Sequence, residues 1–370
     1  MADYGKNFVQ LHNHTHYSLL DGASKIPDLA KRAAELEMPA VGITDHGNMH
    51  GAYEMYTNCV ANGVKPIIGI EAYVTPETAR QDKSRVHWGT EAQRRDDVSG
   101  GGLITHLTMW AENDEGLVNL IKASSVANLE GRVMRYPRMD KEVLSTYSKG
   151  VIASSGCPSG IIQTRLRLGQ FDEALRAAGE FQDIFGKDNF FIELMDHGLT
   201  IENQVTDDLL TIAKKLDAPL LATNDSHYVH AEDAGAQDAM LCINSGSRLD
   251  DPDRFKFDGT GYYIKTAEEM RELFKDHPDA CDNTLLIAER CNVMFDDHED
   301  GAFMPQFPCP EGWDETSLFL KKVEEGLEKR YDGNPPLNVL KQADYECGVI
   351  CQMQFCGYFL VRSEEHTSEL

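Results

Sequence analysis

Two histidines stand two residues apart, at positions 12 and 14, where the apolar stretch Phe8-Val-Gln-Leu11 ends. On an extended chain, residues i and i+2 point to the same side. His12 and His14 can therefore direct two ring nitrogens towards one point, which is a sound beginning for a metal site. Taken alone, the pair is equally compatible with a polar loop.

Further donors of the kinds that bind metals occur at, or just beyond, the C-terminal halves of later apolar stretches. With the first pair they are five histidines, a cysteine, a glutamate and an aspartate: His12, His14, His46, Glu71, His106, Cys157, Asp225 and His227. Asp21, in the loop after the first stretch, is a ninth candidate. One ion takes about four to six donors, so the set predicts about two or three ions. Its wealth of imidazole favours zinc, manganese or iron over magnesium or calcium alone.

Several ions held about 3.5–4 Å apart can clamp the oxygens of a phosphoryl group during in-line displacement. Phosphoester hydrolysis is therefore the reaction class that this set of residues favours. Catalysis by a cysteine nucleophile is the weaker alternative, because Cys157 has no histidine apart from those already in the set.

Each candidate also has a purely structural explanation. His106 could be a core histidine with satisfied hydrogen bonds, and Glu71 could pair with a buried lysine or arginine. Cys157 could be a small apolar residue at a helix entry, and Asp225-Ser-His227 could cap a helix. Their joint placement at strand ends favours the metal site.

Neighbouring residues divide into two groups. Four could orient the imidazoles from behind: Thr44, Asp45, Glu193 and Asn224. Five other histidines are expected at the rim or in solvent: His16, His50, His87, His197 and His230.

The elements that must position these residues alternate along the chain. Apolar runs predict strands at about 8–16, 40–46, 64–74, 103–110, 150–156, 189–195 and 219–227. Helical patterns lie between most of them, at about 25–36, 51–62, 116–128, 160–186 (two helices), 201–216 and 231–242. Such alternation is typical of parallel β/α folds. We expect a closed barrel rather than an open sheet, because the C-terminal ends of barrel strands converge on one mouth.

The alternation breaks in two places. Residues 76–102 are highly charged and predict a mobile insertion at the barrel rim. Beyond residue 250 we expect a hairpin over 254–265, a proline-rich connector, and helices at about 267–275, 281–291, 315–330 and 338–354. The expected division is a barrel over 1–250 and the start of a second domain over 251–361. Residues 362–370 look like a translated sequencing adapter, so we expect the chain to be truncated.

The composition limits the classes of function. The 370 residues are 41% hydrophobic and 26% charged, which is ordinary for a globular protein. A net charge of −26 argues against a surface that coats nucleic acid generally, although bound ions could still hold a phosphate. No apolar run of membrane-spanning length and no signal peptide is evident. The nine cysteines form no close Cys-x-x-Cys pair, so we expect a reduced, cytoplasmic protein.

These motifs resemble those of a known family. His12-x-His14, Thr44-Asp-His46, Gly69-Ile-Glu71, Thr105-His106, Ser155-Gly-Cys157 and Asn224-Asp-Ser-His227 are similar to the polymerase and histidinol phosphatase (PHP) domain. Over residues 7 to 361 the chain most resembles the N-terminal part of the alpha subunits of bacterial DNA polymerase III, the C-family replicative polymerases. Lys65-Pro-Ile-Ile-Gly-Ile-Glu-Ala-Tyr73 and Glu193-Leu-Met-Asp-His-Gly198 are close to their pattern.

The resemblance implies a distorted seven-stranded β/α barrel with a trinuclear metal centre. It implies nine ligands: His12, His14, Asp21, His46, Glu71, His106, Cys157, Asp225 and His227. Asp225, His14 and Asp21 are the expected catalytic residues. Family members with the full set are linked to metal-dependent 3′→5′ exonuclease proofreading, whereas members with eroded sets keep the barrel as a structural and docking platform. The implied partners are the primer 3′ end of DNA, and the sliding clamp and clamp loader through regions beyond this chain.

Residues 345–361 look like the entry to a polymerase palm, but Cys347, Cys351, Gln354 and Cys356 depart from the expected pattern. The palm's catalytic aspartates would lie beyond residue 361, so we do not expect this polypeptide to polymerise DNA. Two alternatives to a nuclease stay open. One is a free-standing phosphatase for a small phosphate ester, against which the region after residue 250 counts. The other is a structural metal module without catalysis.

Overall fold

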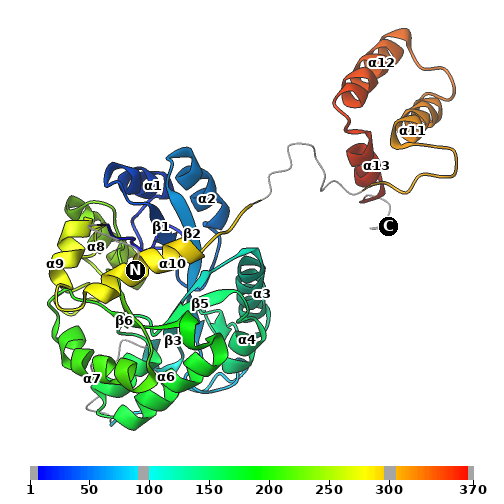
Figure 1. Cartoon of the computed structure of the whole chain (residues 1–370). Coiled ribbons are helices and arrows are strands. Elements are labelled where there is room, and N and C mark those ends of the chain that lie inside the picture. Colours follow the sequence, from blue (N-terminus) through cyan, green and yellow to red (C-terminus); the bar gives the residue numbers. More distant parts are fainter. Residues whose placement is uncertain (1–6, 91–99, 296–305, 366–370) are drawn as a thin grey trace. The chain divides into compact units, whose positions relative to one another are not determined.

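The computed structural model describes residues 7–90, 100–295 and 306–365. The chain forms two compact units, Met1–Phe295 and Asp296–Leu370 (Figure 1). Within the described part of the chain, no helix is long and apolar enough to cross a membrane.

The first unit is built on a curled seven-stranded sheet. Its main path has the order β1 (Ala40–Ile43), β2 (Lys65–Val74), β3 (Thr105–Ala111), β5 (Val151–Ser154), β6 (Phe190–Leu194) and β7 (Leu220–Ala222). The short strand β4 (Arg138–Met139), which the sequence did not predict, pairs with the end of β2. The sheet confirms the expected distorted α/β barrel.

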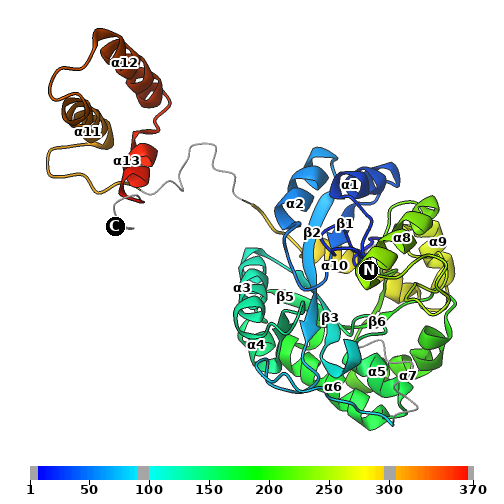
Figure 2. The same cartoon turned by 180° about the vertical axis from the view of Figure 1, so that it is seen from behind.

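Helices surround this sheet (Figures 1 and 2). They are α1 (Ile26–Glu35), α2 (Ala52–Ala61), α3 (Asp114–Glu130), α4 (Lys141–Thr146), α5 (Ile161–Arg167), α6 (Phe171–Phe185), α7 (Thr200–Leu216) and α8 (Ala234–Ser245). All but α4 lie at predicted positions. Short 3-10 turns lie at Gly100–Gly102, Lys187–Asn189 and Ala231–Asp233.

The extended segment at residues 8–16 closes the barrel, although it is bonded too irregularly to count as a strand. On one side Gly42 N donates to the Gln10 carbonyl (2.8 Å) and Thr44 N to that of Asn13 (2.9 Å). On the other side it meets the stretch after β7: His14 N donates to Ser226 O (2.8 Å), and Ser226 N donates to His12 O (3.1 Å). The first and last strands of the sheet are thereby joined.

The expectation of a fully parallel barrel is wrong at β3. This strand runs antiparallel to both of its neighbours, with Glu71 of β2 opposite Thr108 and with Thr108 opposite Ser154 of β5. The reason lies in the connection, because a parallel neighbour requires a crossover, usually helical. Residues 75–104 contain no α-helix in their described part and return the chain along β2 instead.

The described parts of this connection are fastened by Arg138, whose side chain is fully buried. Its guanidinium donates to the carbonyls of Arg80 and Asp82, both at 2.7 Å, and to those of Gly131 (3.1 Å) and Leu103 (3.3 Å). Residues 91–99, in the middle of the predicted mobile insertion, lie outside the described residues.

Two apolar cores hold the first unit together. The larger lies between the sheet and the surrounding helices. The smaller fills the barrel interior, with one or two residues from each element of the wall: Val9, Leu11, Ala40, Ile67, Trp110, Ile152, Phe191 and Leu221. Helix α10 (Pro278–Arg290) packs Leu285, Ile287 and Ala288 into this inner core and crosses one end of the barrel (Figure 1).

The segment that follows residue 250 differs from the prediction. No hairpin forms over 254–265; instead His227 N donates to Tyr262 O (2.7 Å) and Ile264 N to Val229 O (3.3 Å), so this segment pairs with the stretch after β7. Helices α9 (Ala267–Leu273) and α10 form as expected. The expected boundary at 250 lies inside the first compact unit, and the division into functional domains stays a prediction.

The second unit contains α11 (Glu315–Arg330), α12 (Leu337–Gln352) and α13 (Cys356–Glu365). A small core of Phe319, Cys356 and Leu360 joins α11 to α13. The described residues of this unit include helices and no strand. Of the suspected adapter segment 362–370, residues 366–370 lie outside the described residues.

Truncating Ile287 to alanine should destabilise the first unit by about 2–5 kcal/mol, because it leaves a cavity where α10 closes the barrel. Ile287 is fully buried, whereas its neighbour Leu286 is 36% exposed. Leu286→Ala is therefore the matched control and should cost less than about 1 kcal/mol. Urea unfolding followed by circular dichroism measures both. Equal costs for the two variants would contradict the packing of α10 into the barrel.

Candidate metal centre

One face of each barrel strand carries an apolar residue deep inside and a polar one nearer the mouth. Ile67 is followed by Glu71, Ile152 by Ser154, Phe191 by Glu193 and Leu221 by Thr223, at even spacings that keep both side chains on one face. On β3 the order is reversed, and His106 precedes Trp110. Because β3 runs antiparallel, this reversal brings His106 to the same mouth as the others.

Glu71 lies at the middle of the predicted set and is 1% exposed. Its Oε2 is 2.7 Å from His46 Nδ1 and 3.3 Å from His14 Nε2. Its Oε1 is 3.0 Å from His106 Nδ1 and 3.6 Å from His12 Nε2. The recorded ion pairs of Glu71 in the described part of the chain are therefore with imidazoles, which removes the alternative of a lysine or arginine partner.

Two aspartates complete the cluster on the side nearer solvent. Asp225 Oδ1 lies 3.1 Å from His14 Nε2 and 3.3 Å from His12 Nε2. Asp21 Oδ2 lies 2.8 Å from His46 Nε2 and 3.7 Å from His227 Nε2. The loops that follow β7 and precede α1 thus meet across the cluster.

All nine predicted positions belong to one connected group. Three sets of donors lie within 4.8 Å of one another: His14, His46 and His227; His12, His14 and Glu71; and His46, Glu71 and His106. Cys157 joins through its Sγ, which is 3.4 Å from His106 Nδ1. Residues separated by more than two hundred positions are therefore close enough to share ions.

Hydrogen bonds around the histidines determine which ring nitrogen faces the centre. The Ser18 hydroxyl donates its only proton to Asp45 (2.6 Å), so it must accept from His14 Nδ1 (2.9 Å). His12 Nδ1 donates to Glu193 Oε1 (2.7 Å), and His227 Nδ1 donates to the Asp225 carbonyl (2.8 Å). In all three rings Nε2 is therefore the nitrogen that faces the centre, and it is the atom that would bind a metal once it carries no proton.

Buried atoms without a hydrogen-bond partner test whether the centre suits metal ions. Six of them belong to the nine candidates: His12 Nε2, His14 Nε2, Asp21 Oδ1, His46 Nδ1, Asp225 Oδ1 and His227 Nε2. A buried polar atom without a partner is costly and calls for an explanation. Cations placed among these donors would satisfy them, so the residues present fit a divalent-metal centre.

The electrostatics differ from one ring of the centre to the next. Burial, together with repulsion from His46 and His227, lowers the pKa of His14 to about 3, so the ring is neutral near pH 7. Burial alone would raise the pKa of Asp225, but His12 and His227 hold it below its usual value. Burial would likewise lower the pKa of His12, yet Asp225 and Glu193 raise it well above normal. Without ions, protonated imidazoles balance the buried carboxylates, and divalent cations that replaced those protons would balance the same charge.

The four expected orienting residues are all buried beside the centre. Glu193 holds His12 directly and accepts from Thr223 Oγ1 (2.5 Å) and from Ser154 Oγ. Asp45 acts on His14 through Ser18. Thr44 Oγ1 accepts from Asn13 N (3.0 Å), between the two first histidines.

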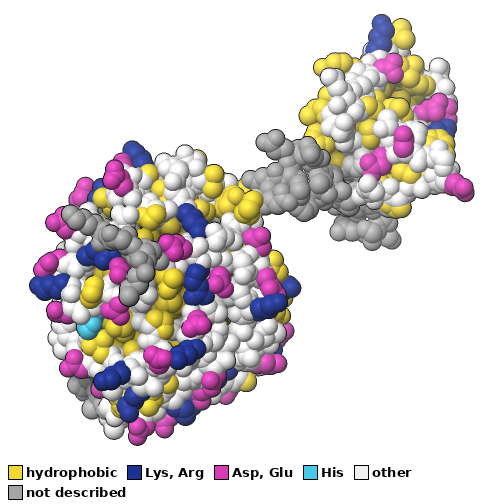
Figure 3. All heavy atoms as spheres, in the orientation of Figure 1, with side chains coloured by type: hydrophobic (Ala, Val, Ile, Leu, Met, Phe, Trp, Pro, Cys, Tyr) yellow, Lys and Arg dark blue, Asp and Glu magenta, His cyan; other side chains and the backbone are white. Residues whose placement is uncertain are grey.

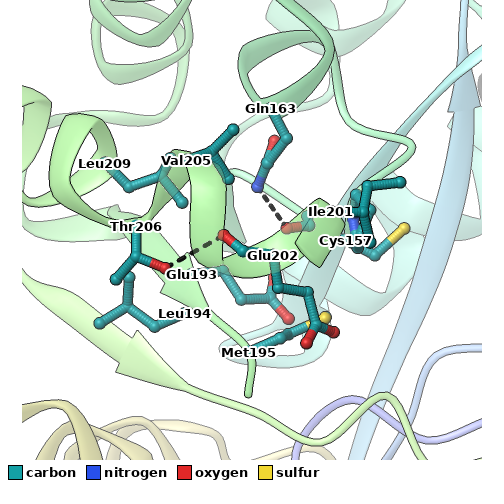
Figure 4. A pocket seen from close by; sticks show the side chains of 12 residues that line it. Cys157, Gln163, Glu193, Leu194, Met195, Ile201, Glu202, Val205, Thr206 and Leu209 are labelled. Atoms are coloured by element: carbon teal, nitrogen blue, oxygen red, sulfur yellow. Dashed lines mark hydrogen bonds between the residues drawn. The ribbon is translucent and has the colours of Figure 1, made fainter. Parts of the chain in front are cut away.

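Glu193 and Cys157 also line a small pocket between α5, β6 and α7 (Figure 4). Of the nine candidate ligands, Cys157 is the one that lines this pocket.

A group of buried residues behind Asp225 was missed in the sequence. His197, expected at the rim, has a side chain only 2% exposed; its ring lies between Glu202 Oε1 (2.6 Å from Nδ1) and the Asn224 carbonyl (3.0 Å from Nε2). Lys265 is 7% exposed and donates to Asn224 Oδ1 (2.5 Å) and to the Gly261 carbonyl. Burial lowers its pKa to about 8. A lysine in the apolar run Tyr262-Tyr-Ile-Lys265 was the only sequence signal.

This group fixes a strained turn. Asp225 has a φ of 46°, a left-handed conformation that is uncommon for residues other than glycine. Its neighbour Asn224 donates through Nδ2 to Tyr263 O (2.8 Å) and Gly261 O (3.0 Å). Surrounding structure must over-determine such a conformation for it to persist. Residues 261–265 therefore hold the loop that presents Asp225 and His227.

Comparison with known proteins gives two family matches. Residues 10–197 match the PHP domain, and residues 317–364 match the bacterial DNA polymerase III alpha NTPase domain. The chain is 52% identical over 358 residues to DNA polymerase III subunit alpha of Mycobacterium tuberculosis, covering 96% of this chain. It is 51% identical to that of Saccharopolyspora erythraea and 39% identical to that of Borreliella burgdorferi. The chain spans about 30% of the length of each of these relatives.

Similarity to solved structures is weaker. A protein from Bifidobacterium adolescentis, described as a candidate metal-dependent phosphoesterase, has a TM-score of 0.36 at 15% identity. The match covers 73% of this chain and 96% of that one.

Replacing Lys265 by methionine should lower the affinity of the centre for divalent ions by roughly 10–100-fold, the usual effect of losing a residue that supports a ligand. The change leaves Asn224 Oδ1 without its buried donor and removes one of the two donors to the Gly261 carbonyl, so the turn at Asp225 loosens. Ion titration of chelator-treated protein, followed by elemental analysis, gives the affinity. Lys256→Met, which removes an exposed lysine of the same segment, is the control. Unchanged ion affinity in Lys265→Met would contradict this role.

Proposed function

The chain belongs to the PHP domain family, and from this membership we propose that its barrel holds divalent ions and hydrolyses phosphodiesters. The proposal rests on six buried nitrogen and oxygen atoms of the candidate ligands. They converge on the centre of the barrel mouth, and no described hydrogen bond satisfies them. The similarity to DNA polymerase III alpha subunits supports DNA as the substrate. We propose a 3′→5′ exonuclease acting on the primer end of DNA in the cytoplasm, within a protein whose whole-length relatives replicate DNA.

The proposed ligands are the nine residues of the cluster: His12, His14, Asp21, His46, Glu71, His106, Cys157, Asp225 and His227. Their number suits about two or three ions, and their imidazole content suits zinc, manganese or iron. When bound, such ions supply Lewis-acid stabilisation to the phosphoryl group under attack. Glu71, within reach of four histidines, is placed to be shared between ions.

Three side chains of the cluster are proposed to act on the reacting groups. Asp225 and Asp21 are the carboxylates nearest solvent, with side chains 14% and 18% exposed. Asp21 Oδ1 has no hydrogen-bond partner and is proposed to bind an ion at the mouth, beside the reacting groups, while Oδ2 remains with His46. His14 is held neutral by burial and by repulsion from His46 and His227. Its hydrogen bond to Ser18 keeps Nε2 directed between Glu71 and Asp225.

A second candidate function is a structural metal module without catalysis. The observation that favours it is the position of the cluster, which joins the closing segment, β1, β2, β3 and the loop after β7. Ions there would stabilise the barrel whether or not they hydrolysed anything. A free-standing phosphatase is less favoured, because residues 317–364 match a DNA polymerase III alpha domain.

Asp225→Asn and His14→Ala should each slow the removal of a 3′-mismatched nucleotide from a primer by at least about a hundredfold, because each loses a donor of the centre. The measurement is release of the terminal nucleotide by purified protein loaded with Mn²⁺. His50→Ala is the control, since His50 is exposed and close in sequence to the cluster without belonging to it. Digestion at the normal rate by either of the first two variants would refute the proposed site.

Complete removal of ions should lower the melting temperature of the first unit by roughly 10 °C, because ligands that bind only the folded state stabilise it. The reason is specific here: without cations, Glu71, Asp225 and Asp21 repel one another in a buried space. Calorimetry before and after chelation measures the shift, with elemental analysis to verify removal. His14→Ala should show a smaller shift. An identical melting curve with and without ions would exclude the structural module.

A further inference from the structure

The centre opens to solvent along one side. Among its members the most exposed side chains are those of Asp21 (18%), His46 (15%), Asp225 (14%) and His106 (12%). His12 and His14, in contrast, are completely buried. Anything that reacts at the centre must therefore approach past the residues that surround these four.

A tight turn at residues 133–136 packs on Tyr73, which lies beside His46 and His106. Tyr73 is 5.9 Å from the ring of His46 and 5.4 Å from that of His106, and Tyr136 packs edge-on against Tyr73 at 5.1 Å. Tyr136 and Val133 exchange two backbone hydrogen bonds of 3.0 Å, which close a tight turn with Arg135 near its tip. The Arg135 guanidinium lies 5.4 Å from the Tyr136 ring centre.

The same arginine connects this turn to the opposite loop. Arg135 Nη1 donates to Asn244 Oδ1 (2.7 Å), and Asn244 Nδ2 donates to the Leu20 carbonyl (3.3 Å), next to Asp21. Arg135 is exposed, and its side-chain hydrogen bonds are to neutral groups, the Asn244 amide and the Tyr136 hydroxyl, rather than to a carboxylate. Its charge is therefore available to an anion at the mouth.

Another aromatic ring lies at a different edge of the cluster. Phe257 meets the His227 ring edge-on at 4.7 Å and packs on Tyr262 at 4.8 Å. Like Tyr136, it is half-buried, so part of its ring remains accessible. The mouth thus has Tyr136 packed on the ring that lies beside His106, Phe257 beside His227, and a guanidinium between the turn and the loop that carries Asp21.

We propose that Tyr136 and Phe257 stack against the terminal bases of single-stranded DNA while Arg135 holds a backbone phosphate, so that the 3′ end enters the centre. This inference rests on the proposed nuclease function and names the residues that select its substrate. Aromatic side chains bind bases of any sequence by stacking, and guanidinium matches phosphate geometry. The mouth accepts an unpaired strand because stacking on side chains requires bases that are free of a complement.

The surface charge is consistent with DNA binding through a few local contacts at the mouth. The net charge is −26, and on the face shown in Figure 3 basic and acidic side chains are interspersed rather than segregated. A protein without a broad basic field makes few phosphate contacts, so the salt dependence of its DNA affinity is shallow. Stacking next to an ion centre is then the main source of affinity.

The first test is binding of a fluorescein-labelled, single-stranded twelve-nucleotide DNA with a 3′-terminal phosphorothioate, measured by anisotropy with Mn²⁺-loaded full chain. Tyr136→Ala and Phe257→Ala should each weaken binding by about 5–100-fold. Arg135→Ala should reduce the slope of log affinity against log salt by about 0.7. Lys149→Ala is the charge-matched control, because Lys149 is exposed before β5, at the opposite end of the barrel strands, and should bind normally.

Two further measurements keep the inference falsifiable if a variant misfolds. Tyr136→Leu retains apolar packing against Tyr73 but removes the aromatic ring, and it should bind as weakly as Tyr136→Ala. With unaltered protein, a DNA carrying 5-iododeoxyuridine at its 3′ end should cross-link to Tyr136 or Phe257, as located by mass spectrometry. Cross-links confined to residues 306–365, or tighter binding of the equivalent RNA, would overturn the inference.

Failure of this inference can be told apart from failure of the proposed function. If unaltered protein hydrolyses neither DNA nor bis(p-nitrophenyl) phosphate, the nuclease proposal fails, and the anisotropy and cross-linking results still decide whether the mouth binds DNA. If it hydrolyses both, and Tyr136→Ala and Phe257→Ala lose no more activity on DNA than on the small diester, the stacking role is wrong. A greater loss on DNA supports it.

Discussion

The burial of an ionisable cluster inside the barrel is the constraint on which the rest of the structure depends. Taking a charge out of water costs several kcal/mol even after the surroundings relax. Here Glu71 is almost completely buried among four imidazoles, and two aspartates lie within the same group. Proteins tolerate such an arrangement when the charges are matched by cations and the remaining polar atoms are held by hydrogen bonds. The hydroxyls and carboxylates behind the histidines supply the second condition.

Those hydrogen bonds explain why the centre is so deeply embedded in the fold. Each of three histidines gives its Nδ1 proton to a different kind of acceptor: a hydroxyl for His14, a carboxylate for His12 and a backbone carbonyl for His227. The acceptors of His14 and His227 lie four and two residues away along the chain, whereas that of His12 is Glu193 of β6, so the direction of the His12 ring depends on the barrel being closed. The same segment, residues 8–16, therefore serves both the centre and the closure of the barrel. It provides the imidazoles of His12 and His14 and joins the first and last strands of the sheet.

Residues that follow the barrel strands in the sequence also support the centre. The segment 261–265 reaches back through Lys265 and two carbonyls to hold Asn224, and α10 closes the far end of the barrel. Both belong to the compact unit that extends to Phe295. A barrel cut where the strands and helices cease to alternate would lose the restraint on the turn at Asp225. This dependence explains why a strained, left-handed aspartate can persist at the mouth.

The sequence by itself determined the helices and most strands, because their signals are local: apolar residues repeat with the periods of helix and strand. It also indicated all nine residues that meet at the centre, since ionisable side chains at the ends of apolar runs are unusual. Only the tertiary structure decided the direction of β3, which depends on the path of residues 75–104 rather than on its own residues. The roles of His197, Lys265 and Arg138 likewise arise from hydrogen bonds to distant backbone carbonyls and amides. No local periodicity encodes such contacts, so they become visible only when the chain is folded.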